Sequence, residues 1–123
     1  MFNFKCVTSI FIKTMKNLKS VINGHLDILV HQKEDEFENV TDCWNEILIH
    51  GDPEGLRSLA NLLLKLADLD QESITSLPVG ARAHEHLRPK LELSSSSETV
   101  IVGRLDAKGT GAFYDGYSSN NVS

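Results

Sequence analysis

Residues 46–69, EILIHGDPEGLRSLANLLLKLADL, decide the fold of this chain. The aliphatic residues near its start predict a β-strand over Trp44–His50. Their imperfect alternation favours a central strand that is partly covered on both faces. The Leu-rich remainder predicts an amphipathic helix, and a turn of Gly, Asp and Pro separates the two. The rest of the chain must supply the surface that this helix buries.

The start of the predicted helix carries all of the usual helix-initiation signals. Asp52 can cap free backbone N–H groups, Pro53 suits the first helical position, and Glu54 complements the helix dipole. Apolar residues then follow three/four spacing at Leu56, Leu59, Ala60, Leu63, Leu66 and Ala67, with Leu62, Leu64 and Leu69 widening the apolar face. Because each buried leucine contributes roughly 1.5–3 kcal/mol, we expect the helix over Asp52–Leu69 to be the main core element.

Shorter extended segments flank this unit. Leu26–Val30 has apolar residues at every second position, which predicts a half-buried strand, whereas the acidic stretch Lys33–Glu38 predicts a hairpin loop or irregular excursion. Downstream, the sequence predicts a long connection over Gln71–Arg82, short extended pieces at Ala83–Leu87 and Leu91–Leu93, a polar turn at Ser94–Ser97, and a β-branched strand at Thr99–Leu105.

Together these elements predict an α+β fold with the order β-β-α-β-β. We expect a small, mainly antiparallel sheet of about four strands, with one long amphipathic helix on one face. We assign this single domain to residues 21–106. Residues 1–20 are expected to be an N-terminal extension. Because Met15 is an alternative start, we expect that removal of residues 1–14 leaves stability unchanged. Residues 107–123 are expected to be a Gly/Ser/Asn-rich tail whose end is disordered.

The composition and net charge of the chain limit the classes of function that it can have. The net charge of −5 argues against nucleic acid as a partner and is compatible with a basic protein. No apolar run approaches the ~20 residues of a membrane helix, and no secretory cleavage pattern follows the apolar N-terminus. We therefore expect a cytoplasmic protein without membrane contact, in which Cys6 and Cys43 are reduced and mostly buried thiols.

The sequence gives only weak signals for a metal site, a phosphate-binding loop or a catalytic site. His84 and His86 share a face if they lie in a strand, and could begin a metal site, but no third ligand has a matching spacing. Edge-of-core hydrogen bonding is the more ordinary role for both. Gly103–Gly111 lacks the helix that must follow a phosphate-binding loop, and no spacing joins a nucleophile to a base. We expect no metal, no cofactor and no catalytic residues.

Acidic residues before the central strand form the best candidate surface. They crowd into one short segment around an aromatic side chain, and comprise Glu34, Asp35, Glu36, Phe37, Glu38 and Asp42. A solvated loop explains any one of these residues alone. As a group they favour a basic protein partner.

The order of several motifs resembles a known family. Ile47–Leu56 with its Gly-Asp turn and EGL helix start, then His84–Leu87, Leu91–Ser94 and Val100–Val102, is similar to the small bacterial immunity proteins of polymorphic toxin systems, group thirty-two. The resemblance covers roughly residues 26–105. The acidic insertion at 33–42 and the tail after residue 105 fall outside it.

The resemblance implies a non-enzymatic protein that binds and neutralises a cognate toxin. Occlusion of the toxin's active site or substrate groove would be the mechanism, and a basic toxin such as a nuclease would suit an acidic inhibitor. Two alternatives stay open. One is a small metal- or ligand-dependent enzyme that uses His84 and His86, and the other is a structural or regulatory homodimer.

Overall fold

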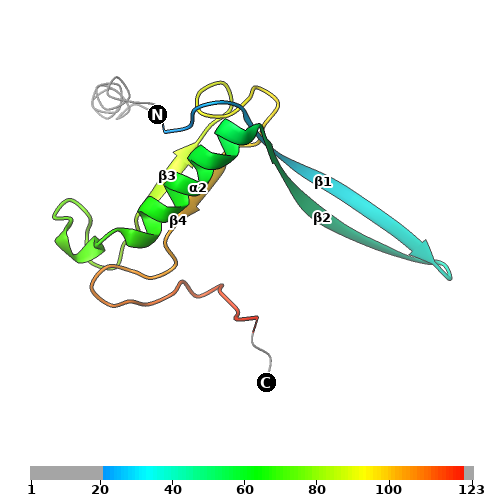
Figure 1. The fold of residues 1–123 in the computed structure, drawn as a ribbon. Helices are drawn as coiled ribbons and strands as arrows, with labels where there is room; N and C mark the ends of the chain where they lie inside the picture. The colour runs from blue at the N-terminus through cyan, green and yellow to red at the C-terminus, as the bar shows by residue number, and fades with distance from the viewer. Residues whose placement is uncertain (1–20, 121–123) are drawn as a thin grey trace, which may run out of the picture.

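The computed structural model describes residues 21–120 (Figure 1). Its elements are β1 (Leu26–Phe37), β2 (Val40–Gly51), α2 (Pro53–Asp68), a short 3-10 helix (Gln71–Ser73), β3 (His84–Leu87) and β4 (Val100–Gly103). The predicted α+β class and the order β-β-α-β-β are confirmed. The predicted extension at 1–20 lies outside the described residues.

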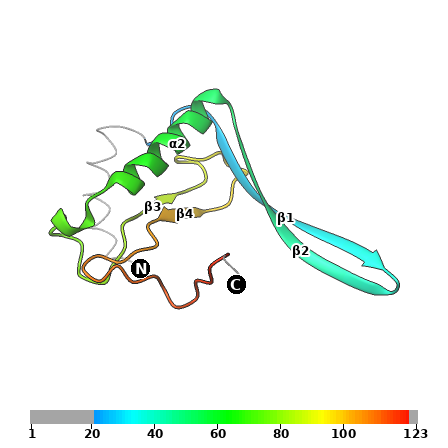
Figure 2. The ribbon, with the colours of Figure 1, turned by 60° about the horizontal axis from the view of Figure 1, so that its bottom comes forward.

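The four strands form two antiparallel sheets of two strands each, rather than a single sheet. Figures 1 and 2 show α2 lying along the small β3–β4 sheet, while the long β1–β2 hairpin projects away from both. The loop at 94–98 explains the separation. Ser94 and Glu98 donate backbone N–H bonds to the carbonyls of Leu26 and Ile28, at 3.0 and 2.7 Å. This loop thus occupies the edge of β1 that another strand would need.

Two predictions about strands were wrong. Lys33–Glu38 is not a loop, because Lys33 to Phe37 continue β1 in regular pairing with β2. β2 is not a central covered strand either, since β1 is its only partner in the described chain and Ile47 and Ile49 are half-exposed. In the exposed part of this hairpin, backbone hydrogen bonds between β1 and β2 hold the strands together in place of apolar burial.

The start of α2 forms as predicted. The Asp52 carboxylate accepts the N–H of Gly55 at 2.8 Å and also the N–H of His25 at 3.0 Å. These two backbone donors hold the Asp52 pKa below its usual value. Gly55 is required by close packing, because a Cβ there would lie 1.9 Å from the His25 carbonyl oxygen. The glycine of the EGL motif is therefore explained by a close contact between the start of α2 and the chain segment that precedes β1.

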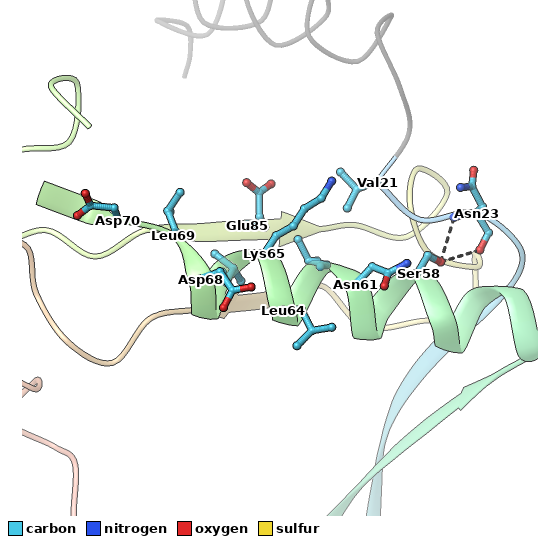
Figure 3. Close-up of a pocket in the computed structure, with 12 residues that line it drawn as sticks. Val21, Asn23, Ser58, Asn61, Leu64, Lys65, Asp68, Leu69, Asp70 and Glu85 are labelled. Atoms are coloured by element: carbon cyan, nitrogen blue, oxygen red, sulfur yellow. Dashed lines mark hydrogen bonds between the residues drawn. The ribbon is translucent and has the colours of Figure 1, made fainter. Parts of the chain in front are cut away.

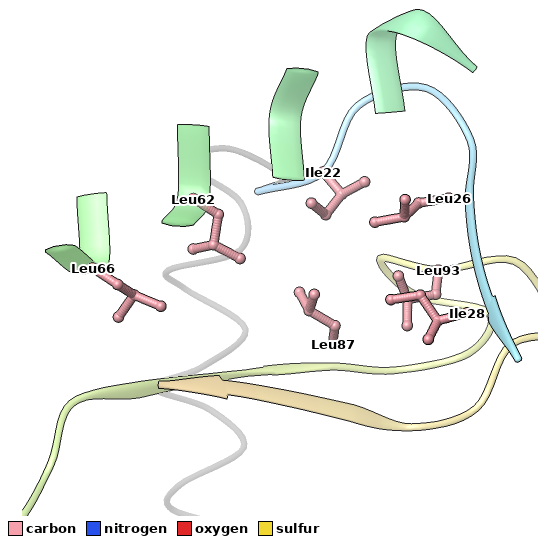
Figure 4. Close-up of a cluster of buried hydrophobic side chains, with 7 residues drawn as sticks. All are labelled: Ile22, Leu26, Ile28, Leu62, Leu66, Leu87 and Leu93. Atoms are coloured by element: carbon pink, nitrogen blue, oxygen red, sulfur yellow. The ribbon is translucent and has the colours of Figure 1, made fainter. Parts of the chain in front are cut away.

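The core lies between α2 and the sheets (Figure 4). Its buried members are Ile22, Leu26, Ile28, Leu62, Leu66, Leu87 and Leu93. Only two leucines of α2 belong to it, and Leu56, Leu63 and Leu64 are exposed. The buried stripe of the helix is therefore narrower than its sequence indicates.

The end of α2 is held by Arg104, which follows β4. Its guanidinium donates to the carbonyls of Leu66 and Leu69 at 2.9 and 2.7 Å and forms a two-pronged ion pair with Asp106. This pairing lowers the Asp106 pKa. One side chain thus joins the last turn of the helix to the end of the β3–β4 sheet.

The remaining segments differ in part from expectation. Leu91–Leu93 is a turn closed by an isolated bridge from Pro89 to Leu93, not an extended piece. Ser94–Ser97 is a polar turn as predicted. After β4, Ala107 is buried and Lys108 donates to the carbonyls of residues 74 and 77. The proposed domain limit between residues 106 and 107 stays a prediction.

Candidate interaction surface on the β1–β2 hairpin

The hairpin ends in a two-residue turn at Glu38 and Asn39. Both residues have positive φ, at 53° and 68°. This is the backbone that matches the twist of a tight hairpin, and it suits Asn far better than Glu. The turn therefore fixes the register in which Phe37 pairs with Val40 and Asp35 with Asp42.

The register brings the predicted surface residues together. Glu34, Asp35, Glu36, Phe37, Glu38 and Asp42 all lie at the far end of the hairpin, and we call this set the acidic tip. In Figure 1 this end is the part of the hairpin most distant from α2. All six residues are exposed.

The two faces of the acidic tip differ in character. Because side chains alternate along a strand, Glu34 and Glu36 lie on one face. Asp35 and Asp42 lie directly opposite each other on the second face, beside the pair Phe37 and Val40. Phe37 is 72% exposed and Val40 60% exposed. The second face therefore combines like charge with uncovered apolar surface.

Trp44 extends this second face toward the body of the molecule. It lies opposite Lys33, is 43% exposed, and donates its ring N–H to Glu46 at 3.1 Å. Exposed aromatic rings among charged groups are typical of residues that anchor protein interfaces. Sequence reasoning identified Phe37 but missed Val40, whose place opposite Phe37 depends on the turn.

The charges of the acidic tip are uncompensated within residues 21–120. None of its five carboxylates forms an ion pair with a described residue, and Lys33 is the one basic side chain on the same part of the hairpin. Directly opposed like charges destabilise a strand pair. A basic partner would remove this repulsion on binding.

The base of the hairpin is firmly attached, so the acidic tip has a defined direction. Asp27 accepts hydrogen bonds from the hydroxyls of Ser94 and Ser96, which lower its pKa. The buried Ser97 hydroxyl accepts the N–H of Ile28 at 3.0 Å and donates to its carbonyl at 3.1 Å. These bonds connect the strand that carries the acidic tip to the core.

The other candidate residues do not assemble a site. His84 and His86 share the face of β3 turned away from Leu87, with ring centroids 5.0 Å apart. His84 Nδ1 lies 2.9 Å from the Arg82 carbonyl oxygen. The described part of the chain contains no group of three or more His, Cys, Asp or Glu residues placed to hold a metal.

The prediction that Cys43 is a buried thiol is wrong. It lies on the solvated hairpin opposite Glu34 and is exposed and unpaired in the structure. Cys6 lies outside the described residues. In the same described range, no helix is long and apolar enough to cross a membrane.

Comparison with known proteins identifies part of the chain. Residues 46–105 match the family model described as Immunity protein 32. The matched segment contains the end of β2, all of α2, β3 and β4, and it leaves the acidic tip outside. No match was found among curated proteins or solved structures. The resemblance inferred from the sequence motifs is therefore confirmed over residues 46–105, which are similar to the immunity protein 32 family.

Proposed function

We propose that this chain is a bacterial immunity protein that binds a cognate toxin and blocks its active site or substrate groove. The match of residues 46–105 to Immunity protein 32 carries the proposal. The chain acts by protein binding alone, without a cofactor or catalysis, in the cytoplasm of the cell that it protects.

We propose the acidic tip as the surface that contacts the toxin. Its five carboxylates lie at the end of a projecting two-stranded ribbon. The exposed end of this ribbon carries negative charge, as the backbone of a nucleic acid does. A basic nuclease groove shaped for a phosphate backbone would therefore attract it, and opposite charge would speed the encounter.

A protection assay tests this function. The toxin encoded beside this chain's gene is expressed in cells with and without the chain. We expect the chain to restore growth, and the triple variant Glu34→Lys, Asp35→Lys, Glu36→Lys to lose protection while remaining folded. Unimpaired protection by the triple variant would remove the acidic tip from the proposal. Failure of the unmodified chain to protect would remove the immunity function itself.

Formation of a homodimer is a second candidate function, and one observation supports it. Val30, Ile47 and Ile49 lie on one face of the hairpin and are 49%, 59% and 50% exposed. Exposed apolar side chains on a two-stranded ribbon are suited to pairing with a second copy. Light scattering on a size-exclusion column that gives a monomer at high concentration would rule this candidate out.

A further inference from the structure

A groove of about 920 Å³ runs along α2 on the side toward β3 (Figure 3). Leu62, Leu64, Leu66 and Leu69 supply its apolar surface. Leu64 is 60% exposed, although it belongs to the Leu-rich face of the helix. We call this feature the α2–β3 groove. It lies apart from the hairpin and takes no part in the proposed toxin contact.

The chain leaves the described region directly at this groove. Val21 lines it and is 41% exposed. The next residue, Ile22, is buried in the core. Asn23 is attached to α2 through Ser58, whose hydroxyl accepts the Asn23 N–H at 3.2 Å and donates to the Asn23 carbonyl at 2.9 Å. The 20 residues before Val21 are therefore tethered at the groove.

The charges of the groove and of this segment are opposite. Among the described residues, Asp68, Asp70 and Glu85 line the groove together with a single cation, Lys65. Residues 1–20 contain four lysines, no arginine and no acidic residue. Because the whole chain carries −5, removal of these four positive charges leaves −9 on the remainder. Attraction to the acidic remainder therefore favours a docked segment over a free one.

The apolar content of the segment also fits. Phe2, Phe4 and residues 10–12 (Ile-Phe-Ile) give it large apolar side chains beside its lysines. The groove offers the exposed side chain of Leu64, with carboxylates at its rim. Covering Leu64 would stabilise the chain by removing apolar surface from water, and the tether makes the event intramolecular, which gives the segment a high effective concentration.

We propose that residues 1–20 dock in the α2–β3 groove of their own chain, with lysines facing Asp68, Asp70 and Glu85 and apolar side chains covering Leu64. The segment is then part of the folded molecule. This differs from the sequence-based expectation that residues 1–14 are dispensable for stability.

Paramagnetic broadening in the isotope-labelled full chain tests the docking. A spin label is attached at Asn61→Cys, an exposed groove position, in a background with Cys6→Ser and Cys43→Ser. We expect amide signals of residues 1–20 to lose most of their intensity. The control label sits on the natural Cys43 in a Cys6→Ser chain, where those signals should keep their intensity. Equal intensities with both labels would overturn the proposal.

Two further arms test which groups hold the segment and whether it docks on its own chain. The variant Asp68→Lys, Glu85→Lys should restore the broadened signals, whereas Glu98→Lys, Asp115→Lys, with the same change in charge, should not. Restoration by both variants or by neither would contradict recognition by groove carboxylates. Broadening in a mixture of spin-labelled unenriched chain and unlabelled enriched chain would show that a second copy fills the groove, and would overturn the intramolecular assignment.

Discussion

Asp52 illustrates how much one residue can reveal in advance. Its place before Pro53 and Glu54 predicts a helix cap, and the structure shows that cap. Its second role, accepting the His25 N–H, could not be predicted, because that contact joins residues 27 positions apart. Arg104 was missed for the same reason. Its partners at Leu66 and Leu69 precede it by more than 30 residues, and nothing near Arg104 in the sequence indicates them.

The double role of Asp52 predicts an unequal effect of two substitutions. Asp52→Ala removes both hydrogen bonds and should lower the melting temperature by about 4–8 °C, the scale for loss of a cap in a small domain. Asp52→Asn keeps an accepting oxygen and should lose much less. Thermal unfolding followed by circular dichroism measures both. Equal losses would mean that charge, not capping, is the contribution.

Arg104 should not be replaceable by lysine. Lysine keeps the charge, but its three N–H donors sit on one nitrogen and cannot replace the four bonds that the Arg104 guanidinium donates to two helix carbonyls and both oxygens of Asp106. We expect Arg104→Lys to lower the melting temperature by about 4 °C or more, while Arg57→Lys, at an exposed position of α2, changes it little. Indistinguishable melting curves for the two variants would contradict the bridging role of Arg104.

The secondary-structure elements differ in how well the sequence predicts them. α2 and β4 follow from apolar periodicity and β-branched content, and the predicted positions of α2, β3 and β4 are confirmed within a few residues. The outer half of the hairpin was missed because Lys33–Glu38 is polar at almost every position. Its strand structure comes from backbone pairing with residues 40–44 across a tight turn, and periodicity of apolar residues does not report such pairing.

The turn itself makes a prediction at this scale. Glu38 occupies a left-handed conformation that suits Asn, so Glu38→Asn should stabilise the hairpin by up to about 1 kcal/mol. Slower hydrogen exchange of hairpin amides between Glu34 and Cys43 would report it. Glu36→Asn removes the same charge from a strand position and should not slow exchange. If both variants slow exchange, relief of charge repulsion is the cause, and the turn is not strained.

At the scale of the whole molecule, the α+β class and strand order were predictable, but the division into two sheets was not. That division depends on the loop at 94–98 binding β1 in place of a strand. The candidate site shows the same limit. Its acidic residues were identified from composition, whereas their display at the end of a projecting ribbon required the structure.

Acid stability is a property of the whole molecule that follows from three carboxylates. Asp27, Asp52 and Asp106 have pKa values in the folded state below the ordinary value. Since the folded state binds protons less readily than the unfolded state, their contribution is present above about pH 4 and is lost as the pH falls through the lowered values. We expect urea-unfolding free energies to be level near pH 6 and to drop below pH 4.

The Asp52→Asn variant checks the origin of this drop. It cannot titrate at that position, so its stability should fall less steeply below pH 4 than that of the unmodified chain. Asp115→Asn, whose carboxyl is exposed, should follow the unmodified chain. An identical slope for all three proteins would assign the acid sensitivity to other groups.

The central claim, toxin binding through the acidic tip, is tested most directly by calorimetric affinity for the catalytically inactivated toxin encoded beside this chain's gene. Glu34→Lys, Glu36→Lys alters one face of the hairpin, Asp35→Lys, Asp42→Lys alters the other, and Glu98→Lys, Asp115→Lys is the control with the same change in charge. We predict that at least one tip variant weakens binding tenfold or more, about 1.4 kcal/mol, while the control binds within a few-fold of the unmodified chain. Equal affinity of all four proteins would contradict the account.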